Sequence, residues 1–292
     1  MLAFAAIYVL WGSTFLAIRF AVQTMPPLLM MGTRHLGAGG LLFLWQYSRG
    51  QWKPEPRLWR SALIAGAFCF LGCHSLLAWA ELRLSSGLAA LLSATLPIWM
   101  VLLARFRGQG SELTPRVLSG IAIGFAGVAM LVPLRFTGQQ AEGWSALGIV
   151  VCEIFWAIGV IYSRGVRTKP PLATFAAMQM LCGGTLLWLT GLALGEGAQL
   201  HASAFTTRSV VSLGFLIVFG SLVAFTAYTW LLQVSSPAIV STHSYVNPVV
   251  AVFLGWAFAG EPVTVRTLVA TAIILASVAL TSVRRRAPAA RT

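Results

Sequence analysis

The chain is a succession of apolar stretches, separated by short segments rich in glycine, proline and charged residues. An α-helix of about 20 apolar residues crosses the hydrocarbon core of a bilayer. The pattern predicts membrane-spanning helices at residues 2–22, 28–48, 60–80, 86–105, 115–133, 144–163, 172–194, 210–232, 238–258 and 264–283. We therefore expect an all-α membrane protein with ten transmembrane helices.

The composition agrees with a chain embedded in lipid. Hydrophobic residues make up 58% of the 292 residues and charged residues only 9%, whereas about a quarter of a soluble domain is charged. Ten spans with short connections use nearly the whole length, so we expect no soluble catalytic domain beside them. The first apolar run has no basic segment before it and no small-residue cleavage site, so we interpret it as the first helix rather than a signal peptide.

The formal net charge of +13 would suggest a nucleic-acid partner for a soluble protein, but in a membrane protein basic residues set the orientation. The loops after even-numbered helices and the C-terminal tail hold fourteen lysines and arginines. The loops after odd-numbered helices hold only four: Arg83, Arg135, Arg208 and Arg266. The positive-inside rule then places both termini in the cytoplasm, which requires an even number of helices. We expect no nucleic-acid partner.

The two halves of the chain resemble each other. The segment Ser85–Pro97 in the fourth helix matches Ser236–Pro248 in the ninth, and Trp11 in the first helix matches Trp156 in the sixth. Five helices per half is an odd number, so the second copy must enter the membrane inverted relative to the first. Inverted repeats create a site near the middle of the membrane that opens alternately to each side. The predicted repeats span residues 1–133 and 144–283, and a basic cytoplasmic tail follows at 284–292.

Several segments resemble a known transporter family. They are Tyr8–Phe15, Arg19, Pro26-Pro27 and Arg34 in the first half, and Val234–Ala238, Tyr245–Val252 and Gly260-Glu261 in the second. They resemble the ten-helix EamA branch of the drug/metabolite transporter (DMT) superfamily, in particular its YedA-like bacterial inner-membrane members and the related amino-acid exporters. The resemblance covers essentially the whole chain. It implies an inner-membrane transporter, often an exporter, for metabolites such as amino acids, but it does not identify the substrate.

The resemblance also implies a central cavity lined mainly by helices 1, 3, 4, 6, 8 and 9. Trp11 and Trp156 hold related positions in the two halves and are candidates to clamp an apolar or cationic substrate by stacking and cation–π attraction. Because the chain has eleven tryptophans, packing or anchoring at the membrane interface is the alternative role. Tyr228 in the eighth helix is a further candidate for the lining.

Polar residues inside the predicted helices are the other substrate-binding candidates. A carboxylate within the membrane usually faces a partner or a wet cavity, so Glu153 is expected to bind a substrate amine or to carry a coupling proton. Its alternative role is a structural partner for an arginine such as Arg34. His74 and His243 are candidates to relay protons or to hydrogen-bond the substrate, and Tyr245 to line the cavity. Hydrogen-bonded packing groups are the alternative for these three.

Pro97 and Pro248 hold matching positions in the fourth and ninth helices. Each proline removes a backbone donor and frees a carbonyl in the preceding turn, which bends a helix. Two such bends can serve as hinges for gating. Static kinks that improve packing are the alternative.

The motifs of other function classes are missing from the sequence. There is no GxxxxGK[ST] loop, which argues against an ATP-driven pump. There is no aspartate, no HExxH and no GxSxG, so neither a metalloprotease nor a common serine hydrolase is supported. The four cysteines lie in apolar runs without metal-ligand spacing, which predicts free thiols. We expect no enzyme activity, no cofactor and no metal.

The sequence therefore predicts a secondary transporter that exports amino acids, aromatic and other neutral ones included, with broad selectivity and by alternating access. An exporter of lipophilic cations with the same fold is one alternative, and a channel is another. The expected partners are a small-molecule substrate and the lipid bilayer. Protons are a candidate coupling ion, and passive flow down a metabolite gradient stays open beside proton antiport.

Overall fold

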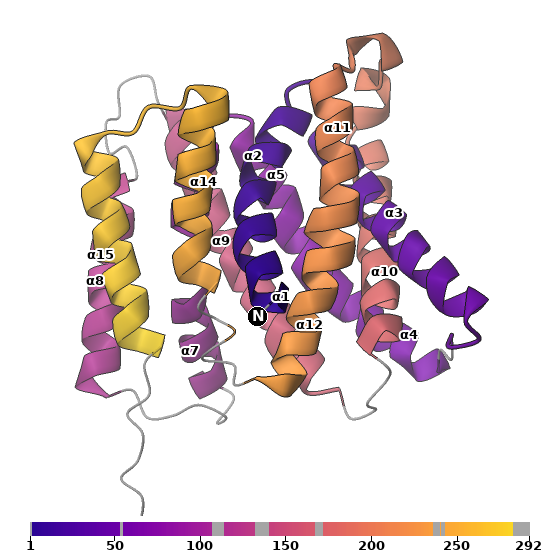
Figure 1. Cartoon of the computed structure of the whole chain (residues 1–292), viewed down its shortest axis with the longest axis horizontal. Coiled ribbons are helices and arrows are strands. Elements are labelled where there is room, and N and C mark those ends of the chain that lie inside the picture. The colour runs from indigo at the N-terminus through magenta and orange to yellow at the C-terminus, as the bar shows by residue number, and fades with distance from the viewer. Residues whose placement is uncertain are drawn as a thin grey trace, which may run out of the picture.

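A computed structural model describes residues 2–52, 55–106, 114–131, 140–166, 172–235, 240 and 243–282. All regular elements among these residues are helices, and no strand occurs among them. The prediction of an all-α fold is therefore confirmed for the described part of the chain. Figure 1 shows the helices standing side by side as one bundle, with α2 near its centre.

The elements follow one another in both halves with short connections. The first half contains α1 (Leu2–Ala5), η1 (Ala6–Leu10), α2 (Trp11–Ala21), α3 (Pro27–Ser48), α4 (Pro56–Gly66), η2 (Ala67–His74), α5 (Ser75–Glu81), α6 (Ser86–Ser93), α7 (Leu96–Phe106) and α8 (Pro115–Leu131). The second half contains α9 (Gln140–Arg164), α10 (Leu172–Ala193), η3 (Glu196–Gln199), η4 (Ala202–Ala204), α11 (Thr207–Phe215), η5 (Leu216–Val223), α12 (Ala224–Val234), α14 (His243–Ala259) and α15 (Val265–Ser282). Contiguous elements join into longer helices, as in α4–η2–α5 and α11–η5–α12.

Six helical runs in the described part are long and apolar enough to cross a membrane: Leu2–Ala21, Pro56–Glu81, Ser86–Leu103, Glu142–Arg164, Ala173–Ala193 and Thr207–Leu231. Shorter apolar helices lie at Val246–Ala259 and Val265–Ser277. The 22-residue helix α3 carries three buried polar side chains, Arg34, His35 and Gln46. These helices make the chain a multi-pass membrane protein, and the count of ten spans stays a prediction.

The fourth predicted helix is interrupted. A single helix was expected over 86–105, but α6 ends at Ser93 and α7 begins at Leu96, with a turn at Ala94-Thr95. Pro97 is the second residue of α7, a position in the first turn where no intrahelical donor is needed. Pro97 therefore starts a new helical segment instead of bending a continuous one. Pro248, by contrast, lies inside α14.

Two glutamates cap the starts of helices that are far away in the sequence. Glu196 in η3 accepts a hydrogen bond from the backbone N–H of Leu29 in α3, at 2.9 Å. Glu261 accepts from the backbone N–H groups of Ser86 (2.8 Å) and Gly87 (3.1 Å) in the first turn of α6. First-turn N–H groups have no partner within their own helix and carry the positive end of the helix dipole. Each carboxylate therefore stabilises a helix start and joins two distant segments.

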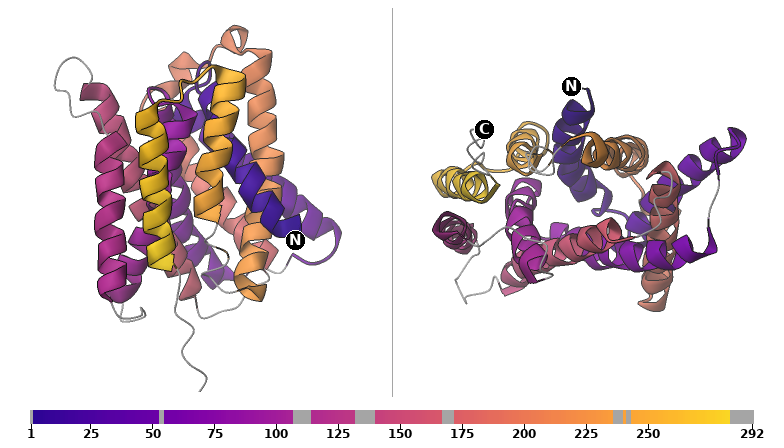
Figure 2. Two further views of the ribbon diagram at one scale, coloured as in Figure 1. Left: turned by 60° about the vertical axis from the view of Figure 1, so that its left-hand side comes forward. Right: turned by 90° about the horizontal axis from the view of Figure 1, so that it is seen from below.

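Glycine allows α3 and α10 to pack closely. A Cβ atom added at Gly184 in α10 would lie 2.9 Å from the backbone nitrogen of Leu36, and one at Gly39 in α3 would lie 3.1 Å from that of Leu181. Gly40 has open space around it instead. Helices in membranes use small residues for such approaches. A second pair, α8 and α15, lies at one edge of the bundle (Figure 2).

Three stretches in the described part of the bundle are π-helical: η1, η2 and η5. The last two have the same length, 8 residues each, and begin 149 residues apart, at Ala67 and at Leu216. They lie in the third and eighth predicted spans, which correspond to each other in the two halves. π turns within α-helices frequently occur at functional sites, and residues of both stretches line the cavity described next.

Candidate functional site

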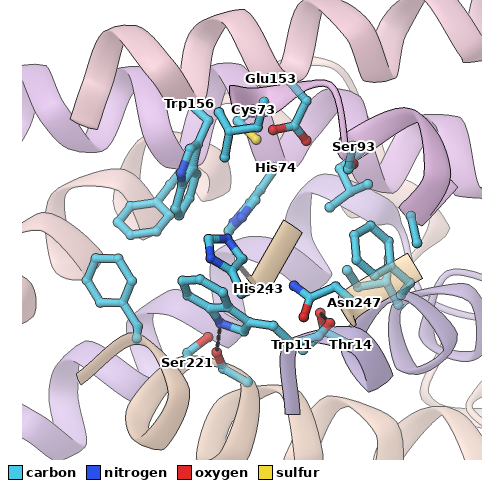
Figure 3. A pocket seen from close by; sticks show the side chains of 18 of the residues that line it. Trp11, Thr14, Cys73, His74, Ser93, Glu153, Trp156, Ser221, His243 and Asn247 are labelled. Carbon is cyan, nitrogen blue, oxygen red and sulfur yellow. Dashed lines mark hydrogen bonds between the residues drawn. The ribbon is translucent and has the colours of Figure 1, made fainter. Parts of the chain in front are cut away.

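A cavity of about 110 Å³ lies inside the bundle. Its walls come from both halves of the chain, mainly from α2, α3, η2, α5, α6, α9, η5 and α14. Figure 3 shows polar and aromatic side chains converging on it. The predicted substrate-binding residues that line it are Trp11, His74, Glu153, Trp156 and His243.

Trp11 and Trp156 lie in edge-to-face contact, with ring centroids 6.3 Å apart and an interplanar angle of 88°. This arrangement is favoured because the positive ring edge meets the negative ring face. Nε1 of Trp11 donates a hydrogen bond to the carbonyl oxygen of Gly220 in η5 at 3.0 Å, which fixes the indole. Tyr228 packs on the Trp11 ring at 4.8 Å but is not part of the cavity lining, so it supports Trp11 from behind.

His74 pairs with a second histidine. Its Nδ1 lies 2.6 Å from Nε2 of His35 in α3, so one imidazole donates a hydrogen bond to the other. Nδ1 of His35 is buried and has no hydrogen-bond partner among the described residues. On its other side, His74 stacks on Trp156 at 5.5 Å. The remaining ring nitrogens are Nδ1 of His35 and Nε2 of His74. Which of them is a donor and which an acceptor depends on which imidazole donates the proton in the bond between the two rings.

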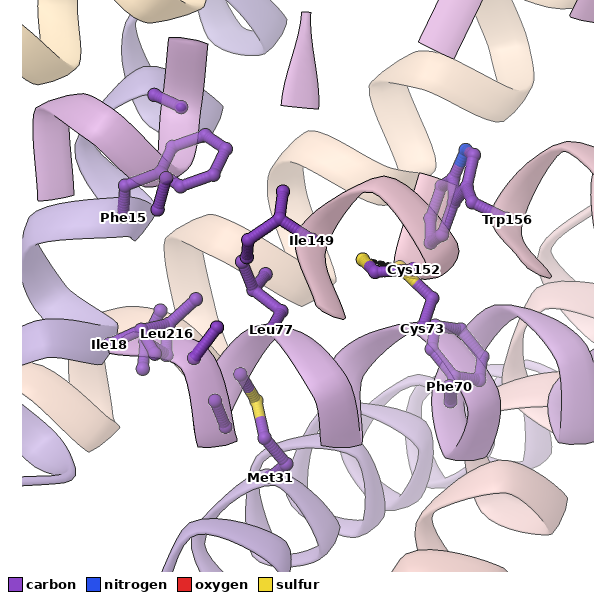
Figure 4. Packing of buried hydrophobic residues seen from close by; sticks show 14 of the residues in the cluster. Phe15, Ile18, Met31, Phe70, Cys73, Leu77, Ile149, Cys152, Trp156 and Leu216 are labelled. Atoms are coloured by element: carbon purple, nitrogen blue, oxygen red, sulfur yellow. Dashed lines mark hydrogen bonds between the residues drawn. The ribbon is translucent and has the colours of Figure 1, made fainter. Parts of the chain in front are cut away.

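Glu153 reaches the cavity from α9 beside two thiols. Sγ of Cys152 lies 3.8 Å from Oε1 of Glu153 and 2.8 Å from Sγ of Cys73 in η2. All four cysteines are free, as predicted, and Figure 4 shows Cys73 and Cys152 side by side within the packed interior. A thiol is a weak hydrogen-bond donor. Glu153 also interacts with the Ser93 hydroxyl. It therefore has neutral hydrogen-bond partners, and no charged group forms a hydrogen bond with it among the described residues.

His243 and Asn247 form the wall on α14. Nδ1 of His243 lies 2.9 Å from the carbonyl oxygen of Val240, which orients the ring, and the ring packs edge-on against Trp11 at 5.2 Å. Asn247 lines the cavity one turn further along, and Pro248 follows it. Tyr245 belongs to the same helix, but its side chain lies outside the described residues.

The structure separates the two predicted hinge residues. Pro248 contributes to the cavity wall, whereas Pro97 in α7 does not. The turn at Ala94-Thr95 lies beside the cavity through Ala94. A hinge role for either proline stays a prediction.

Two basic residues of the cavity wall, Arg34 and His35, were not among the predicted site residues. Both are buried, and Nε of Arg34 donates to Oγ of Ser221 in η5 at 2.8 Å. Ionisable residues inside a membrane helix are functional candidates by default, and this signal was available for both. Arg34 was considered only as a structural partner of Glu153, and no hydrogen bond between the two is present in the described part of the chain.

Comparison with known proteins decides the family. The sequence profile of the EamA-like transporter family matches residues 1–132 and, a second time, residues 143–283. The chain belongs to the EamA-like transporter family. It is therefore a membrane transporter of the DMT superfamily, as the resemblance in the sequence implied.

Curated relatives of this EamA-like protein extend over nearly its whole length. The uncharacterized inner membrane transporter YedA of Escherichia coli (strain K12) is 35% identical over 282 residues, which cover 95% of this chain and 89% of YedA. Protein PagO of Salmonella typhimurium is 25% identical, with 98% and 93% covered, and protein PecM of Dickeya dadantii is 24% identical, with 91% and 86% covered. A solved crystal structure with 21% identity superposes with a TM-score of 0.68 over 96% of this chain and 95% of that chain, which shows a shared fold.

Proposed function

We propose that this EamA-like protein is a secondary transporter that exports amino acids, aromatic and other neutral ones included, by alternating access around the central cavity. The observation that carries the proposal is the cavity itself, in which Trp11, Trp156 and Glu153 meet at one site. Aromatic walls attract many apolar side chains, which supports broad selectivity.

The proposed transport cycle needs two inverted halves. Three observations support ten helices arranged in this way: the repeated sequence segments, the two matches to one family profile, and the matching π-helical stretches η2 and η5. Inverted repeats around a site near mid-membrane are typical of secondary transporters. We further propose that both termini are cytoplasmic, from the distribution of basic residues, and that the chain lies in the bacterial inner membrane, as the name of its relative YedA suggests.

Two side chains of the cavity are suited to proton coupling, Glu153 and His74. Both line the cavity, and His74 shares a short hydrogen bond with His35. Glutamate and histidine within membrane-spanning helices form the proton relays of pumps and transporters. Coupled export would depend on an imposed pH gradient, whereas passive exchange would not.

Uptake into proteoliposomes tests the proposal. A panel of labelled amino acids that includes phenylalanine and threonine is measured with and without a pH gradient, and counter-flow is measured to distinguish a carrier from a channel. Trp156→Ala is expected to abolish saturable phenylalanine uptake, because it removes the ring that contacts both Trp11 and His74. Trp256→Ala is the matched control, since Trp256 is 58% exposed on α14.

Two results would contradict this assignment. Uptake of lipophilic cations without uptake of any amino acid would refute the substrate class and leave the transporter family standing. Saturable phenylalanine uptake that is equal in the Trp156→Ala and Trp256→Ala variants would remove the cavity from the transport path.

A further inference from the structure

Arg34 is a positively charged residue of the cavity wall to which the proposed function assigns no role. Its side chain is 4% exposed, and it lines the cavity from α3. A charge inside the membrane is costly unless it meets a partner or a wet cavity. Nε of Arg34 donates to Oγ of Ser221 at 2.8 Å, and Nη1 lies 3.8 Å from Sδ of Met31. A hydroxyl and a thioether are neutral and compensate little of a buried positive charge.

No carboxylate among the described residues forms a hydrogen bond with Arg34. Glu81 attracts the guanidinium through space, but both of its carboxylate oxygens are without a hydrogen-bond partner among the described residues. Glu153 belongs to a different wall. Figure 3 shows Glu153 and Ser221, the hydroxyl partner of Arg34, on opposite sides of the cavity. The guanidinium therefore keeps N–H donors for a ligand.

A cavity with a cation on one wall and a carboxylate on another suits a ligand that carries both charges. A guanidinium binds a carboxylate through two parallel N–H···O bonds, and a carboxylate accepts hydrogen bonds from an ammonium group. Resting on the proposed function, we propose that Arg34 binds the α-carboxylate of the amino-acid substrate and that Glu153 accepts its ammonium group. The rings of Trp11 and Trp156 then contact the side chain of the substrate.

This arrangement also sets the specificity of the cavity. A buried guanidinium repels a cation that brings no negative group, because like charges interact strongly at low dielectric constant. Lipophilic cations are therefore poor ligands for the site. A zwitterion without net charge binds both Arg34 and Glu153. Its side chain then contacts only the aromatic rings, which accept many apolar side chains.

Three ligands with one phenyl ring separate the two charges. L-phenylalanine carries both, phenethylamine carries only the ammonium group, and 3-phenylpropanoate carries only the carboxylate. Their dissociation constants are measured on purified full-length protein in detergent by isothermal titration calorimetry. Arg34→Gln is expected to lower the ratio of phenylalanine affinity to phenethylamine affinity by about tenfold or more, because it removes a charge-assisted contact to the carboxylate. Glu153→Gln should lower the ratio of phenylalanine affinity to 3-phenylpropanoate affinity in the same way.

Two controls keep a structural role of Arg34 apart from a binding role. Trp256→Ala changes a side chain that is 58% exposed on α14 and lies outside the cavity lining, so it should preserve the phenylalanine-to-phenethylamine ratio. A measurement on the unchanged protein needs no variant to fold: phenylalaninamide, in which the carboxylate is neutral, should bind about tenfold more weakly than phenylalanine.

The outcomes distinguish the two proposals. Equal binding of phenylalanine and phenylalaninamide, or an affinity ratio that Arg34→Gln leaves unchanged, would overturn the role of Arg34 while the proposed function stands. If the unchanged protein bound other metabolites but no amino acid, the proposed function would fall, and the role of Arg34 with it.

Discussion

Removing the carboxylate of Glu261 should destabilise the bundle by an amount that the structure allows us to estimate. Glu261 accepts three hydrogen bonds at the start of α6: from the N–H of Ser86 (2.8 Å), from the N–H of Gly87 (3.1 Å) and from Oγ of Ser86 (3.0 Å). Leaving a buried donor unpaired costs about 1–3 kcal/mol, and a helix cap is worth about 1 kcal/mol. Because water reaches the end of a helix in part, we expect Glu261→Ala to lower the free energy of unfolding by about 2–4 kcal/mol.

The expected change in melting temperature follows from this value. A change of 1 kcal/mol shifts the Tm of a large domain by about 2–4 °C, so Glu261→Ala, at about 2–4 kcal/mol, should melt roughly 4–16 °C below the unchanged protein. Glu261→Gln keeps an acceptor oxygen and loses only the charge that complements the helix dipole. Its shift should be about half as large, since hydrogen bonds to charged groups are roughly twice as strong as neutral ones.

Thermal unfolding in detergent, followed by intrinsic tryptophan fluorescence, measures these shifts. Glu55→Ala is the control, because Glu55 is an exposed glutamate at the N-cap of α4 whose side chain makes no cap hydrogen bond. Its Tm should stay within about 1 °C of the unchanged protein, as for most exposed substitutions. Equal melting temperatures for Glu261→Ala and Glu55→Ala would refute the reasoning, since the three hydrogen bonds would then contribute nothing.

Two further predictions test the packing and the histidine pair. Gly184→Val should prevent recovery of a monodisperse protein in size-exclusion chromatography, because its Cβ would lie 2.9 Å from the backbone of α3. Gly40→Val is the control: a Cβ at this position meets no atom within 4 Å, so this variant should elute like the unchanged protein. His35→Phe should raise the dissociation constant for phenylalanine by about threefold to tenfold, because it removes the hydrogen bond that orients His74. Calorimetry on His35→Phe, His74→Phe and the double variant checks this, and effects that simply add would show that the two rings act independently.

The helical fold was predictable because apolar runs in lipid have few other structures available. Backbone N–H and C=O groups find no water in the bilayer core, so a spanning segment must satisfy them internally. The sequence also brought Trp11, Trp156 and Glu153 into one site, because the repeat assigned their helices to the same axis. Pro97 indicated a bend in the fourth helix, but not the break into two helices at Ala94-Thr95, since the hydropathy is continuous across it.

The remaining site features depend on contacts between distant segments. The bond between His35 and His74 joins α3 to η2, and no spacing within either helix indicates it. The Gly260-Glu261 pair is part of the sequence signature that resembles the family, but the structural role of the two residues is seen only in the folded chain. Gly260 adopts a positive φ of 63° after α14, which L side chains rarely adopt, and the following carboxylate then reaches the start of α6. Sequence alone shows the residues of such a contact but not its partner.

The π-helical stretches give the cavity wall a means of rotation. A π turn holds one residue more than the α turn that would join the same two ends, and each residue of an α-helix turns the chain by about 100°. Moving the extra residue along η2 would therefore turn the face that carries Phe70, Cys73 and His74 while both ends of the helix kept their depth in the membrane. The same holds for Gly220 and Ser221 in η5. Each half of the bundle thus places in the cavity wall a π-helical stretch whose extra residue could shift along the helix.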